Sequence, residues 1–143
     1  MNELREGDEA PDFLELTANK GTTCVVYFYP KDFTPGCTTE ACEFRDMYAK
    51  IQENNAVVIG ISPDSPESHE KFIAHHGLPY TLVADQDHSI AEAYGVWKEK
   101  SMYGKKFMGI ERSTFVIGPD GDIKKIFRRV KPAGHADEVL AAI

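Results

Sequence analysis

The chain has 143 residues, 42% of them hydrophobic and 27% charged, which is typical of one globular domain over residues 1–143. Its formal net charge of −7 argues against nucleic-acid binding through a basic surface. No apolar run approaches the ~18 residues of a membrane span, and the first residues lack the apolar core of a secretory signal, so we expect a cytoplasmic protein without a membrane partner.

After a polar, turn-rich segment over residues 1–23, short apolar runs predict strands and amphipathic runs predict helices. The expected strands cover residues 24–29, 56–61, 78–84, 113–117 and 123–128. The expected helices cover residues 34–53, 66–76, 85–94 and 134–143. Residues 96–110 carry four lysines and are predicted to form an irregular basic segment.

The order of these elements predicts the fold class. The early strands alternate with helices and are continuous apolar runs, which indicates a mainly parallel sheet covered on both faces. A tight turn at residues 118–121 joins the last two strands as an antiparallel hairpin. We therefore expect an α/β protein with a thioredoxin-like fold, in which a central mixed sheet has helices on both faces. Ligands of such sheets bind at the carboxyl ends of the strands.

The junction between the first strand and the first long helix carries the chemistry. Thr34 suits the N-cap, and Pro35 suits the first helical position. Cys37 then lies in the first turn, where unpaired backbone N–H groups favour a thiolate, the reactive form of cysteine. Residues spaced by four, three, four and three form one inward apolar stripe: Cys37, Ala41, Phe44, Tyr48 and Ile51.

The pattern Pro30-x-x-x-Thr34-x-x-Cys37 resembles the active-site signature of peroxiredoxins. With Ala41-Cys42 added, it closely resembles the peroxiredoxin Q subfamily, also called bacterioferritin comigratory proteins. The similarity extends over nearly the whole chain, through segments 44–46, 60–62, 93–97, 103–105, 112–115 and 130–131. One departure is a shorter segment between residue 13 and the first core strand.

The resemblance implies a thiol peroxidase for hydrogen peroxide and organic hydroperoxides that needs no cofactor. Cys37 would be the peroxidatic nucleophile, and Cys42 would resolve its sulfenic acid as an intramolecular disulfide. Thr34, Arg112 and Pro30 match the remaining pocket positions of the family. Thioredoxin or a similar dithiol donor would be the reductant, and members of the subfamily are often monomers.

The chemistry needs more than a thiolate. A more acidic thiol is more ionised but less nucleophilic, and the net gain is only about twofold. Groups aimed at the transition state must supply the rest. Arg112 is expected to donate to the sulfur and the peroxide, Thr34 to hydrogen-bond the bound oxygen, and Pro30 to wall the pocket.

The spacing of the two cysteines makes a separate prediction. Residues five apart on an intact helix have Cα atoms ~8.7 Å apart. A disulfide requires less than ~7 Å. Our hypothesis is that the helix unwinds from about Cys37 to Phe44 when the disulfide forms.

Several alternatives are open at this point. Cys24 lies within a strand and is interpreted as a core residue, with an alternative resolving role. A thioredoxin-type disulfide oxidoreductase is the alternative function, although that chemistry uses a Cys-x-x-Cys spacing. Three cysteines cannot supply a four-thiolate iron–sulfur site within one chain. Asp85 and Asp87 are interpreted as helix caps and not as a metal pair.

Overall fold

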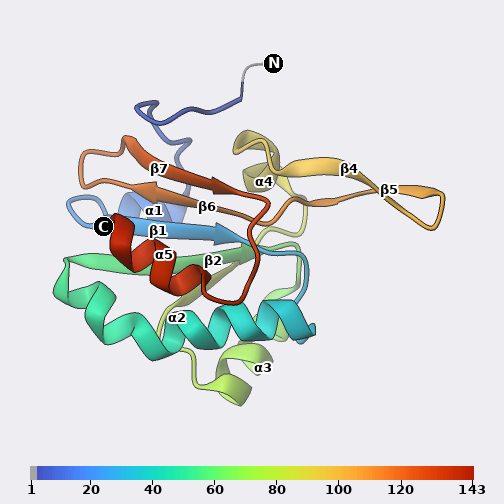
Figure 1. Cartoon of the computed structure of the whole chain (residues 1–143), viewed down its shortest axis with the longest axis horizontal. Helices are drawn as coiled ribbons and strands as arrows, with labels where there is room; N and C mark the ends of the chain where they lie inside the picture. The colour runs from blue at the N-terminus through green and yellow to red at the C-terminus, as the bar shows by residue number, and fades with distance from the viewer. Residues whose placement is uncertain (1–2) are drawn as a thin grey trace.

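The computed structural model describes residues 3–143 and is shown in Figure 1. The helices are α1 (Leu14–Ala18), α2 (Pro35–Glu53), α3 (Pro66–His76), α4 (Ser89–Ala93) and α5 (His135–Ala142). The strands are β1 (Thr23–Phe28), β2 (Ala56–Ser62), β3 (Thr81–Ala84), β4 (Trp97–Met102), β5 (Lys105–Ile110), β6 (Ser113–Ile117) and β7 (Ile123–Arg128).

Five strands form a mixed sheet in the order β3-β2-β1-β6-β7. Strands β1, β2 and β3 pair in parallel, whereas β6 is antiparallel to both β1 and β7. The predicted mixed sheet is confirmed. Strand β1 lies at the centre of this sheet. The loop that leads to α2 therefore starts from the carboxyl end of the central strand.

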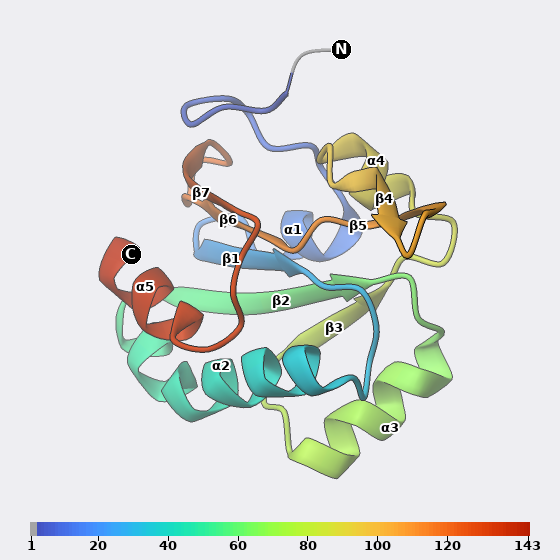
Figure 2. The ribbon, with the colours of Figure 1, turned by 45° about the vertical axis from the view of Figure 1, so that its right-hand side comes forward.

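The two faces of the sheet bury separate apolar clusters, because successive side chains of a strand point to opposite faces. Val26 and Phe28 of β1 pack in the cluster that includes residues of α1 and α4. Val25 and Tyr27 pack in the cluster that includes residues of α2, α3 and α5. Figure 2 shows these two sets of helices on opposite sides of the sheet. The prediction of helices on both faces is confirmed.

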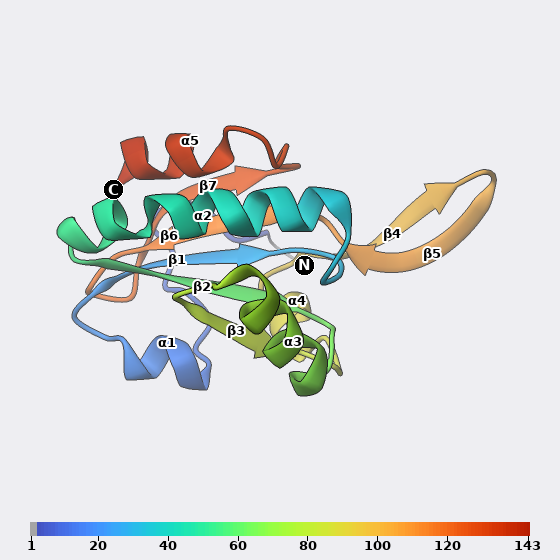
Figure 3. The ribbon, with the colours of Figure 1, turned by 90° about the horizontal axis from the view of Figure 1, so that it is seen from below.

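The segment predicted to be irregular is instead a hairpin of β4 and β5, and it projects from the body of the molecule (Figures 1 and 3). Met102 pairs with Lys105 across a two-residue turn, and its central residues Tyr103 and Gly104 have φ of 53° and 77°. Positive φ at both positions is what a type I′ hairpin turn requires. The prediction was wrong because the four lysines in this segment were taken as the mark of an irregular loop.

The amino-terminal segment also differs from the prediction, since it contains the short helix α1. Before α1, the chain runs beside the turn between β6 and β7, where Glu9 forms a bridge with Asp122. The predicted helix at 85–94 is reduced to α4 because Asp85 lies before it as a cap. Its carboxylate accepts hydrogen bonds from the N–H groups of Ile90 and Ala91.

Among residues 3–143, no helix combines the length and apolar character that crossing a membrane requires.

Candidate active site

The loop between β1 and α2 forms one wall of the site. Pro30 is half-buried and begins this loop directly after Tyr29, whose N–H donates to the Ile61 carbonyl. Thr34 occupies the N-cap position of α2 as predicted, but its side chain makes no capping hydrogen bond among the described residues. Its hydroxyl donates to the Lys31 carbonyl at 2.8 Å. The Thr34 oxygen is therefore left free to accept a hydrogen bond from another group.

Cys37 lies in the first turn of α2, and its side chain is buried with 1% exposure. Arg112 lies in the connection between β5 and β6, far from Cys37 in sequence. Its Nη2 donates to the Cys37 sulfur at 3.2 Å. The fold thus brings Cys37 and Arg112 together, two of the residues that the sequence analysis proposed for the pocket. A guanidinium at this distance can stabilise negative charge that develops beside the sulfur during a reaction.

Glu40 completes this cluster and was missed by the sequence analysis. Arg112 Nη1 lies 2.7 Å from Glu40 Oε1, and the Glu40 side chain is only 1% exposed. Glu40 lies three residues after Cys37, so both side chains share one face of α2. No sequence signal marked it, because a glutamate on a helix is ordinarily exposed.

The Glu40 carboxyl is unusual in its environment. Its second oxygen, Oε2, is buried and has no hydrogen-bond partner in the described part of the chain. Burial raises the pKa of Glu40 to about 7, although the Arg112 guanidinium acts in the opposite direction. The charge on Glu40 therefore changes near neutral pH, next to the cation that contacts Cys37.

Gly36 allows Arg112 to cross the start of α2. A Cβ atom at this position would lie 3.4 Å from Arg112 Nη2 and 3.4 Å from Pro132 Cγ. Both distances are tight for a Cβ contact, so a larger side chain would press on the guanidinium that faces the sulfur. The glycine before Cys37 therefore has a packing role in addition to its place in the motif.

Cys42 does not join this cluster. The helix continues without interruption from Pro35 to Glu53, and Cys24, Cys37 and Cys42 are all free in the described structure. The Cys42 thiol is half-buried and lies 3.7 Å from Nδ1 of His76, at the end of α3. The structure is thus the dithiol form, in which Cys37 and Cys42 have different neighbours.

A buried carboxylate holds the loop that carries Thr34. Asp32 is 4% exposed and accepts hydrogen bonds from the hydroxyls of Tyr29 and Ser68, at 2.6 and 2.8 Å. Its own N–H donates to Asp64 at 2.8 Å. Burial raises the pKa of Asp32, but the hydrogen bonds from His69, Tyr29 and Ser68 outweigh it and leave the pKa below 3.8. Asp32 is therefore ionised and ties the loop to the start of α3.

His69 of α3 supplies the counter-charge. Its Nδ1 lies 2.7 Å from Asp32, and its Nε2 lies 3.0 Å from the Val83 carbonyl. Because both ring nitrogens face acceptors, the ring is an imidazolium that donates twice. Burial lowers the pKa of His69, but the hydrogen bond with Asp32 outweighs it and raises the pKa above 6.5.

Asp64 lies beside this pair, and ligand atoms of Asp32, Asp64 and His69 all lie within 4.8 Å of one another. This is the kind of grouping that can hold a metal ion. Here, however, His69 donates directly to Asp32, and Asp64 accepts from the Asp32 N–H and the Ser62 hydroxyl. The ligand atoms are engaged with one another, so we interpret the group as a buried polar network.

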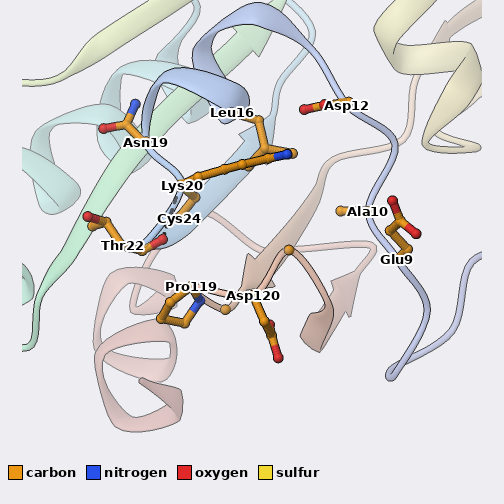
Figure 4. Close-up of a pocket in the computed structure, with 12 residues that line it drawn as sticks. Glu9, Ala10, Asp12, Leu16, Asn19, Lys20, Thr22, Cys24, Pro119 and Asp120 are labelled. Carbon is orange, nitrogen blue, oxygen red and sulfur yellow. Dashed lines mark hydrogen bonds between the residues drawn. The ribbon is translucent and has the colours of Figure 1, made fainter.

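Cys24 lies at the other end of β1 and lines a small cavity of about 60 Å³ with Leu16, Asn19 and Pro119 (Figure 4). Its side chain is 1% exposed, and burial raises the pKa of the Cys24 thiol to about 11. The active-site loop leaves the opposite, carboxyl end of β1. This position agrees with the core interpretation of Cys24.

The sequence profile of the AhpC/TSA family matches residues 5–126. Peroxiredoxin Bcp of Bacillus subtilis is 49% identical over 146 residues, covering 96% of this chain and 93% of that protein. Peroxiredoxin Bcp of Escherichia coli is 42% identical over 149 residues, covering 98% and 96%.

Solved structures agree with these sequence relatives. A cysteine mutant of Xylella fastidiosa PrxQ superposes with a TM-score of 0.92 at 40% identity, covering 99% of this chain and 96% of the other. The Xanthomonas campestris bacterioferritin comigratory protein, studied for its alkyl peroxide reduction activity, gives a TM-score of 0.85 at 48% identity. That match covers 89% of this chain and 81% of the other.

Proposed function

This chain belongs to the AhpC/TSA family of peroxiredoxins and is a thiol peroxidase, and from this premise we propose that Cys37 is its peroxidatic nucleophile. The observation that carries the proposal is the 3.2 Å contact from Arg112 to the sulfur of Cys37 in the first turn of α2. The substrates are hydrogen peroxide and organic hydroperoxides.

In the first step, the Cys37 thiolate attacks one peroxide oxygen. A sulfur–oxygen bond forms, the O–O bond breaks, and the second oxygen leaves as hydroxide or alkoxide and takes up a proton. Arg112 stabilises the negative charge as it moves from sulfur to the leaving oxygen. The Thr34 oxygen accepts a hydrogen bond from the peroxide, and Pro30 limits water at the pocket wall. The product on Cys37 is a sulfenic acid.

In the second step, Cys42 attacks the Cys37 sulfenic acid and forms the disulfide between Cys37 and Cys42. The cysteines lie on one unbroken helix, five residues apart, so the segment from about Cys37 to Phe44 unwinds for this step. Thioredoxin or a similar dithiol protein then reduces the disulfide, and α2 reforms. We propose that the enzyme works as a monomer in the cytoplasm, without a cofactor.

The test of the nucleophile is the Cys37→Ser variant. Removing the thiol should abolish peroxide consumption, because a serine hydroxyl is not ionised at neutral pH. Peroxide consumption and insulin disulfide reduction are measured side by side on the wild-type protein. Insulin reduction without peroxide consumption would favour the thioredoxin-type alternative, and retained peroxidase activity in the variant would contradict the role of Cys37.

The test of the resolving residue is the Cys42→Ser variant. It should complete one turnover and then stop, with a sulfenic acid that mass spectrometry detects on Cys37. Peroxidase activity with thioredoxin is followed through the oxidation of NADPH by thioredoxin reductase. Undiminished multiple turnover in this variant would show that another thiol resolves Cys37.

A further inference from the structure

The Cys42 thiol lies against an imidazole that the two catalytic steps above do not use. Its Sγ is 3.7 Å from His76 Nδ1, and both residues are half-buried. Cys42 belongs to α2 and His76 ends α3, and Figures 1 and 2 show these helices next to each other. The contact therefore joins two elements that the fold holds next to each other.

The position of His76 is fixed by contacts on several sides. Arg45 lies three residues after Cys42, and its Nη1 donates to the His76 carbonyl at 2.7 Å. The Phe72 ring packs edge-on against the imidazole at a centroid distance of 5.1 Å, and the Phe33 ring lies at 6.3 Å. Gly77 ends α3 in the left-handed conformation, with φ of 60°. The imidazole is therefore held in place at the Cys42 thiol.

The groups around His76 keep its ring neutral at pH 7. Its titratable or charged neighbours are Cys42 and Arg45 from α2 and His75 from α3, whose ring lies at 4.7 Å. Phe33, from the loop before α2, carries no charge. Burial, His75 and Arg45 all lower the pKa of His76. A neutral imidazole offers a lone pair to an adjacent thiol.

We propose that His76 is the general base of the resolving step and takes the proton of the Cys42 thiol before Cys42 attacks the oxidised Cys37. This proposal rests on the proposed function, because it requires Cys42 to be the resolving residue. Thiolate is the form of cysteine that attacks. A neutral base at the sulfur supplies that form when the attack begins.

The step balances without an added reactant. The proton of Cys42 Sγ moves to His76 Nδ1 while α2 is still folded. As the segment unwinds, the electron pair of the Cys42 thiolate forms the S–S bond to Cys37, and the S–O bond of the sulfenic acid breaks. The leaving hydroxide becomes water with a proton from solvent, and the imidazolium returns its proton to solvent.

The test compares two variants of neighbouring histidines, His76→Gln and His75→Gln. His75 is exposed and makes no hydrogen bond to Cys42 among the described residues, so it is the matched control. Reduced protein is mixed with one equivalent of hydrogen peroxide in a stopped-flow instrument. Rapid quenching and mass spectrometry then measure the sulfenic acid and the disulfide separately.

We expect His76→Gln to form the sulfenic acid at the wild-type rate and the disulfide about tenfold more slowly at pH 7. The wild-type rate of disulfide formation should fall at low pH, as the imidazole becomes protonated. In the variant the rate should no longer show the part of this dependence that follows protonation of the imidazole, and added imidazole should partly restore the rate. His75→Gln should stay within about twofold of wild type.

Two results separate the proposals. If wild type forms the disulfide and His76→Gln forms it at the same rate with the same pH profile, His76 is not the base. A slower variant that keeps the wild-type pH profile and does not respond to imidazole also overturns the proposal, since it indicates a structural role. If wild type forms no Cys37–Cys42 disulfide, the resolving role of Cys42 fails, and this proposal fails with it.

Discussion

At the scale of single residues, the ionisation of Glu40 controls how much of the positive charge of Arg112 is directed toward the Cys37 sulfur. When Glu40 is ionised, it shares the guanidinium of Arg112 with Cys37. When it is protonated, the full charge of Arg112 is directed toward the sulfur. The burial that raises the pKa of Glu40 therefore links the titration of one carboxyl to the strength of the contact with the nucleophile.

Glu40→Gln should change how stability depends on pH. The pKa of Glu40 is about 7 in the folded protein against an ordinary value of 4.5, so the native state binds this proton more tightly than the unfolded chain. Its contribution to stability is complete below pH 4.5 and is lost as the pH rises through 7. The variant should gain about 3 kcal/mol relative to wild type between pH 4.5 and 8.

Urea denaturation at several pH values measures this difference. Glu53→Gln, at an exposed position near the end of α2, is the control and should follow the wild-type curve. Parallel curves for wild type and Glu40→Gln across this range would contradict the assignment of a raised pKa to Glu40.

The residues of the site differ in how well their positions and contacts could be predicted from the sequence. The position of Cys37 in the first turn of α2 and its contact with Arg112 were predictable because both residues stand in a motif. Glu40 was not, because a glutamate on a helix is ordinarily exposed and nothing in the sequence tells that Arg112 crosses α2. The contact between Asp32 and His69 joins residues 37 positions apart and depends on tertiary packing alone.

At the scale of secondary-structure elements, the loop before α2 is a rigid support for the start of that helix. Asp32 receives three hydrogen bonds from side chains of the loop and of α3. The first turn of α2 is different in character. Gly36, Thr38 and Thr39 have low helix propensity, which reduces the cost of unwinding that turn. A firmly held loop followed by a weak first turn supports the proposal that the conformational change occurs in α2.

Asp32→Asn should destabilise the protein by about 3 kcal/mol, because it leaves the His69 imidazolium buried without its counter-charge. The rate of sulfenic acid formation should fall as well, since the loop carries Thr34. Asp46→Asn is the control: Asp46 pairs with Arg45 at the surface, and its loss should cost less than about 1 kcal/mol. Urea denaturation gives both values, and equal effects of the two changes would contradict the structural role of Asp32.

The elements that the sequence predicted well are those with a clear period and clear ends. Strands β6 and β7 match the predicted ranges, and α3 begins and ends at the predicted residues. The hairpin of β4 and β5 was missed because it has no apolar face to reveal it. Met102, Phe107 and Met108 are all exposed, at 58%, 44% and 49%. Beyond Trp97 and Ile110, which pack at the base of the hairpin, the two strands project into solvent and lack the alternation from which strands are predicted.

At the scale of the whole molecule, β1 lies between the two apolar clusters and contributes side chains to both. Cys24 belongs to the cluster on the side of α1 and α4, and the active-site cysteine belongs to the cluster on the other side. The Cys24 thiol is covered by Leu16 of α1 and by the turn that contains Pro119, so its exposure requires this packing to open. Its accessibility therefore reports the opening of the core on this side of the sheet.

Alkylation of the native protein should label Cys42 readily and Cys24 only on global unfolding. The half-buried Cys42 needs only local motion, whereas Cys24 is buried and its raised pKa keeps it protonated at pH 8. Labelling by iodoacetamide in low urea, read by peptide mass spectrometry, should give Cys24 the same urea dependence as global unfolding. Labelling of Cys24 as fast as Cys42 without urea would contradict its core position.

The burial of the Cys37 sulfur fixes the order of events by molecular size. With 1% of the side chain exposed, hydrogen peroxide, which is hardly larger than a water molecule, needs only a small motion of the protein to reach the sulfur. A protein donor has no such route, so it gains access only after the first turn of α2 has opened. In the proposed cycle the oxidant therefore arrives before the reductant, and a dithiol donor gives its electrons only to enzyme that has already met peroxide.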